Sequence, residues 1–416
     1  MIKAQYLIIG NGVSGMHGAY FIRKLDRKGN ITILTNEATP FYSRPLIIDV
    51  MTGKKRKDDL IILDEKKHNI YGFDLKKDVT VFHIDTKKRQ AGTSVGDVKY
   101  EKLLIATGAL PKKTNFERDG IFYLRTADDA ERIGRYLKKV KKAIVYGGGP
   151  IGIKTVYGLL SMGIHVDVIV SSSHILSRAL DRKASICFQE IFEKNGVSFY
   201  CNREIKDIIW KRGLKGIVTN RGEEIPGDIV IAGKGVKPDI GIAQDAGIMT
   251  DKGIIVDDTM RTNIDNIFAA GDAAQASSAE SGEQRAENRG KKKVVSLWHV
   301  GASQGKTAGC NMAGQSRIYE GSVSSNSVEY FGVKCISMGI VEGEGYEEIV
   351  FEEGRIYKKY LFNGETLVGA VLLDNIEGAG LLLNAIRTGI PIKNSILQMH
   401  NTKSAICNEV NMEVLF

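Results

Sequence analysis

Two glycine-rich hexapeptides have the residue spacing best suited to binding a phosphate group. The first, GNGVSG at residues 10–15, follows an apolar stretch at Tyr6–Ile9 and precedes apolar residues at helical spacing, namely Ala19, Ile22 and Leu25. In such a turn the first glycine makes the bend, the second lets the backbone approach a pyrophosphate, and the third lets helix and strand pack closely. The segment therefore predicts a strand, a nucleotide-binding turn and a helix.

The start of this helix is the expected binding site for the diphosphate, because free N–H groups and the helix dipole favour an anion there. A second strand is expected at Ile31–Leu34, and Glu37 follows it. An acid about 20 residues beyond the turn typically accepts hydrogen bonds from a ribose. The residues predicted to bind the first nucleotide are Gly10, Gly12, Val13, Ser14, Gly15 and Glu37.

The second hexapeptide, GGGPIG at residues 147–152, has similar surroundings. Apolar residues at Ala143–Tyr146 predict the strand before it, Val156 and Leu159–Leu160 predict the helix after it, and Val166–Val170 predict a further strand. Two such folds in one chain imply one tightly held cofactor and one exchanging nucleotide. The residues of this turn predicted to bind the second nucleotide are Gly147, Gly149, Pro150, Ile151 and Gly152.

The second fold lacks an acid at the end of its second strand, where the chain continues as Ser171, Ser172, Ser173 and His174, with Arg178 nearby. An acid there binds the 2′-hydroxyl of NAD, whereas cations and hydroxyls accommodate the 2′-phosphate of NADP. Three interpretations stay open. Ser171, Ser172 and Arg178 hold a 2′-phosphate, NAD is bound by other contacts, or the site is degraded or repurposed.

Size and composition predict an ordinary globular protein of two or three domains, with 416 residues, 43% hydrophobic and 26% charged. No apolar run is long enough to span a bilayer and the N-terminus has no signal-peptide pattern, so we expect a cytoplasmic protein.

The cysteines are too scattered for a local redox dithiol or a zinc knuckle, and no metal site is expected. They are interpreted as buried free thiols: Cys187, Cys201, Cys310, Cys335 and Cys407.

The net charge of +9 comes with four basic clusters. They are not interleaved with aromatic residues and no nucleic-acid motif accompanies them, so we expect no nucleic acid as partner. Either they are a solvated surface or they attract an acidic electron-carrier protein. The clusters are Lys54–Lys57, Lys87–Arg89, Lys138–Lys142 and Lys291–Lys293. The polar segment Ala276–Val295 is likewise either a surface loop or a docking loop for a partner subunit.

Several further segments, in order along the chain, resemble the pyridine nucleotide–disulfide oxidoreductase superfamily. Besides the hexapeptides they are Leu103–Ala109 (LLIATGA), Asp228–Pro238 (DIVIAGKGVKP) and Asn266–Asp272 (NIFAAGD). The resemblance implies an α/β chain with two Rossmann-like domains, for FAD and NAD(P), and a small α+β C-terminal domain. It also implies that Asp272 reaches the ribityl-phosphate region of FAD. Cofactor contacts are expected at Thr107, Gly108, Gly235, Gly271 and Asp272.

Within that superfamily the chain looks most like the branch with rubredoxin reductase and the flavoprotein part of assimilatory nitrite reductase. Phe41–Leu46 (FYSRPL), Trp298–Gly305 (WHVGASQG) and the stretch from Val328 carry this resemblance. It places Arg44, Pro45 and Trp298 near the flavin. Other members have a redox cysteine where this chain has Tyr42-Ser43-Arg44, so electrons are expected to leave FAD directly to an acceptor.

The resemblance also suggests two catalytic residues. Relatives place a glutamate two positions after the last glycine of the second turn and pair it with a lysine beside the flavin. This chain has Lys154 there and, by approximate alignment, Asp49 opposite, so the charges are exchanged. Either both side chains face solvent, or they form an ion pair beside the ring.

The expected domains are an FAD-binding domain of residues 1–110 plus 240–320, an NAD(P)-binding-type domain of residues 111–239, and a C-terminal domain of residues 321–416. The expected activity is that of an FAD-dependent NAD(P)H oxidoreductase, passing electrons between a nicotinamide nucleotide and an iron–sulfur or rubredoxin-like carrier. The alternative is an electron-relay subunit of a multi-subunit complex with a modified or non-functional NAD(P) site. Both a homo-oligomer and a hetero-complex are compatible with the sequence.

Overall fold

The computed structural model describes residues 2–278 and 292–403. These residues form two compact units, the first made of residues 2–178, 185–278 and 292–321, the second of residues 179–184 and 322–403. The expected division of the first unit into FAD and NAD(P) domains stays a prediction. Most of the polar segment Ala276–Val295, Lys291 of the fourth basic cluster and Cys407 lie outside the described residues.

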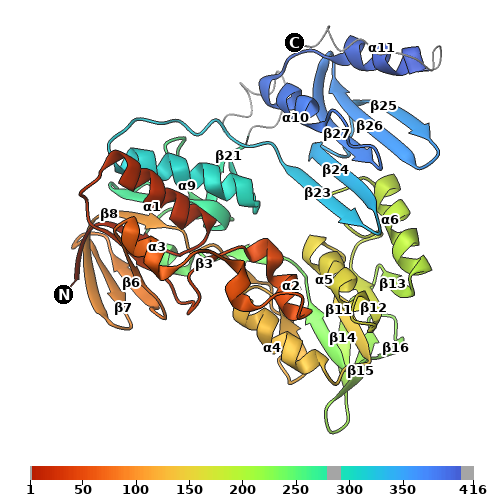
Figure 1. The fold of residues 1–416 in the computed structure, drawn as a ribbon, viewed down its shortest axis with the longest axis horizontal. Coiled ribbons are helices and arrows are strands. Elements are labelled where there is room, and N and C mark those ends of the chain that lie inside the picture. Colours follow the sequence, from red (N-terminus) through yellow and green to blue (C-terminus); the bar gives the residue numbers. More distant parts are fainter. Residues whose placement is uncertain (1, 279–291, 404–416) are drawn as a thin grey trace. The chain divides into compact units, whose positions relative to one another are not determined.

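A seven-stranded sheet forms the first nucleotide fold (Figure 1). Six of its strands follow the order β5-β2-β1-β8-β7-β6, and β20 pairs with β8. The pairs β1–β2, β1–β8 and β20–β8 are parallel, so their carboxyl ends meet at one edge of the sheet. The strands are β1 (Ile2–Ile9), β2 (Ile31–Leu34), β5 (Phe73–Lys76), β6 (Val81–Asp85), β7 (Gln90–Thr93), β8 (Gly96–Ile105) and β20 (Ile267–Ala269).

Helices α1 (Val13–Leu25) and α9 (Trp298–Met312) lie side by side in this fold (Figure 1). Their backbones touch, since an added Cβ on Gly305 would lie 2.1 Å from the Ser14 carbonyl oxygen and one on Gly309 would lie 2.4 Å from that of Gly18. Any larger residue would separate the helices. This contact holds the start of α9 beside the first turn.

A five-stranded, all-parallel sheet of order β10-β17-β11-β12-β13 forms the second fold. Its strands are β10 (Ile121–Tyr123), β11 (Lys142–Tyr146), β12 (His165–Val170), β13 (Val197–Cys201) and β17 (Ile229–Ala232). One face packs on an antiparallel sheet of β14 (Ile205–Trp210), β15 (Leu214–Thr219) and β16 (Glu224–Pro226), with Ile144, Ile169, Ile217 and Ile225 in the shared core. Its helices are α4 (Ala127–Leu137), α5 (Pro150–Leu160) and α6 (Arg182–Lys194).

Helix α2 (Ile47–Met51) joins the two folds. An added Cβ on Gly134 of α4 would lie 2.8 Å from the Met51 carbonyl oxygen, and one on Gly158 of α5 would lie 2.8 Å from the Ile48 side chain. The segment just before α2, with β3 (Phe41–Tyr42) and the 3-10 turn η1 (Arg44–Leu46), is therefore held against the second fold.

Short elements complete the first unit and connect its two folds. They are η2 (Lys57–Leu60), β4 (Ile61–Leu63), α3 (Glu65–Ile70), β9 (Ala109–Pro111), β18 (Val236–Pro238), α7 (Gly241–Asp245), β19 (Ile254–Ile255), η3 (Gly271–Ala273), β21 (Ala274–Ser277) and β22 (Lys292–Lys293).

The second unit is an antiparallel sheet of order β23-β24-β27-β26-β25 with two helices. The buried carboxylate of Asp181 accepts a hydrogen bond from Tyr357, which ties residues 179–184 to this sheet. The elements are β23 (Ser325–Tyr330), β24 (Val333–Gly339), β25 (Glu347–Glu353), β26 (Ile356–Asn363), β27 (Thr366–Leu373), α10 (Ala379–Thr388) and α11 (Lys393–Lys403).

The predicted fold class is confirmed: the chain contains two α/β sheets of Rossmann type and a C-terminal α+β part. The strands predicted beside each hexapeptide are present, and the strand predicted at Ile31–Leu34 has those same bounds. Over the described residues, none of the helices combines the length and the apolar character needed to cross a membrane.

Candidate functional site

The first glycine turn leaves free space where a ligand would approach the backbone. Gly10 has a φ of +112°, and an added Cβ there would lie 2.0 Å from the Ala106 carbonyl oxygen. At Gly15 the same atom would lie 2.0 Å from the Gly10 oxygen. At Gly12, in contrast, it would meet no atom within 4 Å. The first and third glycines are thus required by the protein, whereas the second faces open space.

The polar groups of this turn fit the diphosphate of FAD. Both amide atoms of the Asn11 side chain are buried and have no partner among the described residues. Gly12 begins α1 without a side-chain cap, so the first N–H groups of the helix stay available. Buried polar groups without partners cost about 1–3 kcal/mol each. A bound anion at this helix start would satisfy them.

Glu37 is held in one orientation beside this turn. Its carboxylate accepts hydrogen bonds from the Tyr42 hydroxyl and from Nη2 of Arg44, each at 2.6 Å. Arg44 in turn donates from Nη1 to the carbonyl oxygen of Arg125 at 2.8 Å. Burial raises the pKa of Tyr42, which keeps its hydroxyl protonated as a donor. The structure thus joins the predicted residues Glu37 and Arg44 in one cluster.

Asp272 lies in a second cluster at the same edge of the sheet. Nη2 of Arg125 binds its carboxylate at 2.9 Å. An added Cβ on Gly108 would lie 3.6 Å from that same Nη2, and one on Gly271 would lie 2.1 Å from Oγ of Ser14. The structure therefore brings Asp272 and Gly108 to Arg125, and it places Gly271, the neighbour of Asp272, against Ser14. Sequence reasoning missed Arg125, which belongs to no motif and follows β10 in the second fold.

The start of α9 lies beside the segment that was predicted to underlie the flavin. The Trp298 ring stacks on Phe41 with ring centres 5.9 Å apart and an angle of 14° between the planes. Pro45 follows on η1 and is exposed. Among the described residues no cysteine belongs to this segment; Cys310 and Cys335 are buried, and Cys187 and Cys201 are half-buried.

The second glycine turn repeats the geometry of the first. Gly147 has a φ of +130°, and an added Cβ there would lie 2.4 Å from the Gly233 oxygen. An added Cβ on Gly152 would lie 1.9 Å from the Gly147 oxygen, whereas one on Gly149 or Gly235 would meet no atom within 4 Å. Pro150 opens α5 and Ile151 is exposed beside it. This turn therefore also leaves its second glycine facing open space.

The residues after β12 are arranged differently from a simple phosphate pocket. Val170 is 1% exposed and fills the space beside Gly148, so this position faces the interior. The Ser172 hydroxyl donates to the His174 carbonyl oxygen at 2.8 Å, within its own loop. Ser171 and Arg178 are exposed. Among the residues predicted to hold a 2′-phosphate, Ser172 already donates its hydroxyl hydrogen to a carbonyl oxygen of the protein.

An acid that sequence reasoning missed lies next to Ser171. Oε2 of Glu204 accepts hydrogen bonds from the Tyr146 hydroxyl and from Nζ of Lys234, and Lys234 also lies 4.4 Å from the centre of the Tyr146 ring. Burial raises the pKa of Glu204, but hydrogen bonds from Lys234, Tyr146 and Ser171 outweigh it and lower the pKa below its usual range. The second fold therefore has an ionised carboxylate at the carboxyl edge of its sheet.

The two residues predicted to be catalytic do not form an ion pair. Nζ of Lys154 instead donates to the Pro45 carbonyl oxygen at 2.5 Å, across the two folds. Burial lowers the pKa of Lys154, and the charge of Asp49 partly restores it, so the two side chains influence each other at longer range. A role for either one in catalysis stays a prediction.

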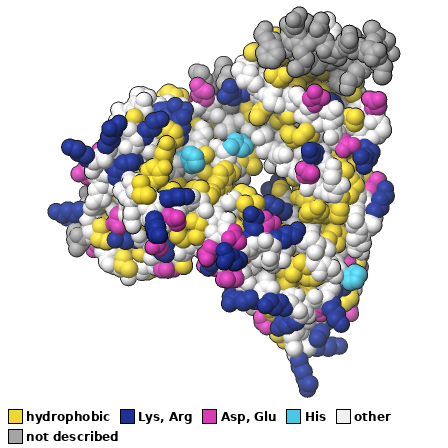
Figure 2. All heavy atoms as spheres, in the orientation of Figure 1, with side chains coloured by type: hydrophobic (Ala, Val, Ile, Leu, Met, Phe, Trp, Pro, Cys, Tyr) yellow, Lys and Arg dark blue, Asp and Glu magenta, His cyan; other side chains and the backbone are white. Residues whose placement is uncertain are grey.

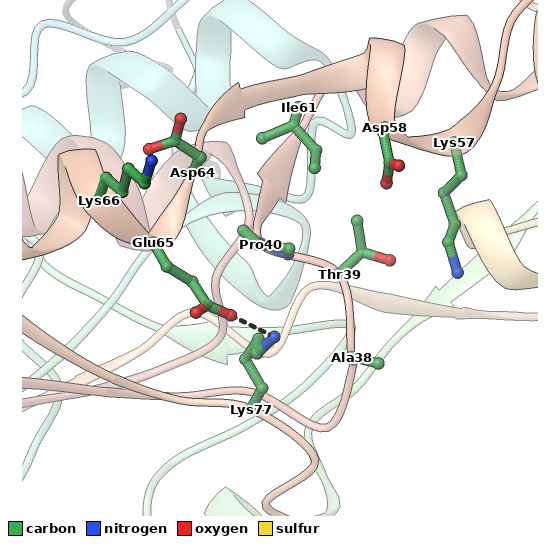
Figure 3. Close-up of a pocket in the computed structure, with 10 residues that line it drawn as sticks. All are labelled: Ala38, Thr39, Pro40, Lys57, Asp58, Ile61, Asp64, Glu65, Lys66 and Lys77. Atoms are coloured by element: carbon green, nitrogen blue, oxygen red, sulfur yellow. Dashed lines mark ion pairs between the residues drawn. The ribbon is translucent and has the colours of Figure 1, made fainter.

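A pocket of about 510 Å³ lies beside β4 and α3 (Figure 3). Its charges are mixed, and the lining residues Lys77 and Glu65 form an ion pair at 2.5 Å. It contains none of the predicted site residues.

Lys and Arg side chains are spread over the face shown in Figure 2, with acidic side chains among them. No cluster of metal-binding side chains occurs in the described parts of the chain.

Three relatives illustrate the similarity of this chain to known proteins. Nitrite reductase [NAD(P)H] of Bacillus subtilis is 30% identical over 411 residues, covering 96% of this chain and 49% of the relative. NADH-rubredoxin oxidoreductase of Clostridium acetobutylicum is 28% identical over 401 residues, 95% of each chain. A subunit of NADH-dependent phenylglyoxylate dehydrogenase, epsilon, of Aromatoleum evansii is 26% identical over 393 residues, covering 92% of this chain and 91% of the relative.

The fold is also that of a solved relative. A crystal structure of NADH:rubredoxin oxidoreductase from C. acetobutylicum matches with a TM-score of 0.79 and 24% identity, covering 95% of this chain and 100% of that one. The chain spans about half the length of the first nitrite and nitrate reductase relatives that it matches.

Two family profiles match in sequence. That of the rubredoxin NAD+ reductase C-terminal domain matches residues 325–390, within the second unit. That of pyridine nucleotide-disulphide oxidoreductase matches residues 4–305, which include both glycine turns and the clusters around Glu37 and Asp272. The chain therefore belongs to the pyridine nucleotide-disulphide oxidoreductase family, whose members use FAD and NAD(P)H.

Proposed function

We propose that this chain is an FAD-dependent NAD(P)H:acceptor oxidoreductase that passes electrons between a nicotinamide nucleotide and an iron–sulfur or rubredoxin-like carrier protein. The observation that carries the proposal is the pair of glycine turns in one compact unit. Each leaves open space beside its second glycine, Gly12 or Gly149, at the start of a helix. The relatives named for NADH and rubredoxin support the choice of donor and acceptor.

The residues of the first fold have separate binding roles in this proposal. The N–H groups at the start of α1 bind the diphosphate of FAD, and Glu37 accepts hydrogen bonds from a ribose while Tyr42 and Arg44 hold it in place. Asp272, oriented by Arg125, binds nearer the ribityl chain. FAD supplies the redox chemistry, and the protein supplies position and electrostatic environment.

The residues of the second fold hold a nucleotide so that its nicotinamide faces the flavin site. Gly147, Gly149 and Gly152 shape the turn for its diphosphate. Lys154, on the helix that follows, is hydrogen-bonded to Pro45 of the first fold and so fixes α5 against the segment predicted to underlie the flavin. This placement is the kind of positioning that lets two bound groups react without a diffusional search.

Anaerobic mixing tests the proposal directly. Purified protein containing FAD should lose its flavin absorbance when NADH or NADPH is added, and a rubredoxin or ferredoxin should restore it. If neither nucleotide bleaches the flavin but dithionite does, the chain is not an NAD(P)H oxidoreductase.

That outcome would favour the second candidate, an electron-relay subunit whose second fold is a scaffold. Two observations support this candidate: the similarity to a dehydrogenase subunit from A. evansii, and the absence of an acid directly after β12.

The proposal also includes a carrier protein or iron–sulfur subunit as partner, a homo-oligomer or hetero-complex as the assembly, and a cytoplasmic location. Size-exclusion chromatography of the purified chain, alone and with a carrier protein, would test the first two.

Thiol chemistry can be tested with a variant in which all five cysteines are replaced by Ser or Ala. Tyr42-Ser43-Arg44 stands where relatives have a redox cysteine, so the five cysteines should have no catalytic role. The variant should therefore reduce and reoxidise its flavin at rates within about twofold of the wild-type rates. A folded variant that had lost turnover would restore a thiol mechanism.

A further inference from the structure

We propose that Glu204 is the ribose-binding acid of the second nucleotide site, and that its carboxylate makes the site select NAD(H) over NADP(H). The inference rests on the proposed function, because it assigns specificity to that same site. It concerns a residue outside every motif of the sequence, located after β13 rather than after β12.

Backbone contacts place Glu204 where the missing acid is needed. In a parallel sheet β13 lies beside β12, so the residues after both strands share one edge. The N–H of Asn202 donates to the Ser172 carbonyl oxygen at 3.0 Å, and the N–H of Arg203 donates to that of Val170 at 3.0 Å. The chain after β13 is thereby fastened to the chain after β12, and the Glu204 carboxylate reaches the Ser171 hydroxyl.

The carboxylate is oriented yet accessible. Oε2 of Glu204 accepts both hydrogen bonds, from Tyr146 and from Lys234, and 43% of the Glu204 side chain is exposed. A carboxylate has about four acceptor positions, so a ribose hydroxyl can still bind it. Tyr146 is the last residue of β11, and the glycine turn begins directly after it. The acid is therefore fastened to the strand that leads into the turn.

The first fold provides an internal precedent for this arrangement. There Glu37 accepts one hydrogen bond from a tyrosine, Tyr42, and another from a cation, Arg44. In the second fold Tyr146 and Lys234 take these two places. A tyrosine hydroxyl and a cation thus contact a carboxylate at the carboxyl edge of both sheets.

The cations of this region do not favour a 2′-phosphate. Lys234 is bound to Glu204, and Arg203 is bound to Glu223 at 2.7 Å. Arg178 is exposed, and an ion pair at an exposed position contributes only about 0–1 kcal/mol. A 2′-phosphate beside Ser171 would face the negative charge of Glu204. Among the three interpretations left open by the sequence, the structure therefore favours NAD bound by other contacts.

The test is to titrate the FAD-containing protein with NAD+ and NADP+ by isothermal titration calorimetry, and to measure flavin reduction by NADH and NADPH in parallel. The wild type should bind NAD+ at least about 10-fold more tightly than NADP+. In Glu204→Gln that ratio should fall about 10-fold, mainly because NADP+ binds more tightly once the negative charge is gone. Glu224→Gln, which removes an exposed charge from β16, should leave the ratio unchanged.

Further variants guard against a folding defect in Glu204→Gln. Glu204→Asp keeps the charge and should keep the preference for NAD+. The double variant Glu204→Gln with Lys234→Met removes both charges of the pair, leaves no unpaired cation, and should again lose the preference.

Three results would overturn the inference: a wild type that prefers NADP+, a wild type that binds neither nucleotide, or a Glu204→Gln variant with an unchanged ratio. Failure of the proposed function looks different. In that case NAD+ binds in a Glu204-dependent manner, but NADH does not reduce the flavin.

Discussion

In the first nucleotide fold Glu37 comes directly after the second strand, β2, as the motif requires. In the second fold the corresponding strand ends at the buried Val170, and Glu204 comes from the end of the next strand, β13. Both carboxylates accept hydrogen bonds from a tyrosine and a cation. Adjacency at a sheet edge, rather than order along the chain, therefore decides which residue can bind a ligand.

The glycine turns differ much less than the strand ends. Gly12 has φ −84° and ψ −175°, Gly149 has φ −79° and ψ 179°, and neither would place a Cβ within 4 Å of another atom. The requirement for a close approach of backbone to diphosphate is the same in both folds, because it concerns geometry and not the identity of the nucleotide. Matched substitutions in the two turns can therefore separate the two binding events.

The largest effect is expected from Gly12→Val. The protein has room for the side chain, so the variant should fold, but its methyl groups would occupy the space predicted for the FAD diphosphate. We expect at least about a 100-fold loss of FAD affinity, equivalent to about 2.8 kcal/mol, and a colourless protein after purification. Flavin absorbance and circular dichroism of the purified variant are the measurements. A folded variant with its full flavin content would show that the first turn is not the FAD site.

Gly149→Val is the matched change in the second fold. It should retain FAD and its yellow colour, and lose about 10-fold or more in affinity for NAD+. The measurements are the flavin-to-protein ratio and calorimetric titration with NAD+. Loss of FAD from this variant, with NAD+ binding intact, would mean that the assignment of the two turns must be exchanged.

A smaller effect is expected from removing the tyrosine hydroxyl beside each acid. Tyr42→Phe should weaken FAD binding and Tyr146→Phe should weaken NAD+ binding, each by about 1 kcal/mol or roughly fivefold, because each acid loses one hydrogen bond that orients it. Fluorescence titration of the apoprotein with FAD and calorimetry with NAD+ measure the two constants. If Tyr146→Phe changed FAD binding instead, the cluster around Glu204 would belong to the first site.

Much of the fold could be predicted from the sequence because its determinants are local. Apolar runs and glycine spacing located the strands and helices around both turns. The family resemblance indicated Thr107 and Asp272 as cofactor contacts, and both follow strands that are parallel to β1 or to its neighbour β8. Arg125 and Glu204 could not be predicted in this way. Each reaches its partner from an element far away in the sequence, and only the order of strands in the sheets brings them there.

The position of the missing acid was also misjudged by the linear pattern. The motif places the ribose-binding acid at the end of the second strand, and in this fold that strand ends at Val170. In the structure this side chain is 1% exposed and packs beside Gly148, so a carboxylate there would be buried without a partner. The exposed neighbour Ser171 is the position from which an introduced acid could reach a ribose. Side-chain direction at the end of a strand depends on packing that spacing alone does not reveal.

The smallest effect concerns Lys154, which links α5 of the second fold to Pro45 of the first. Burial lowers the pKa of this ammonium below its ordinary value of 10.5, although the charge of Asp49 partly opposes the shift. In the unfolded chain the lysine keeps its proton to higher pH, so between the two pKa values the unfolded state binds more protons than the folded state. Stability conferred by this residue therefore rises with pH through that window and is constant below it.

Lys154→Met should reveal this dependence when urea unfolding of variant and wild type is compared at pH 7 and pH 10. The wild type should gain stability relative to the variant at the higher pH, by less than about 1 kcal/mol because the side chain is only half-buried. Lys215→Met, which removes an exposed lysine from β15, serves as the control for a general effect of lost charge. If the wild type instead lost stability relative to Lys154→Met as pH rose, the hydrogen bond to Pro45 would raise the pKa of Lys154 by more than burial lowers it. Lys154 would then act mainly as a charged clamp between the two nucleotide folds, and its removal should slow flavin reduction by NADH more than it weakens binding of either nucleotide.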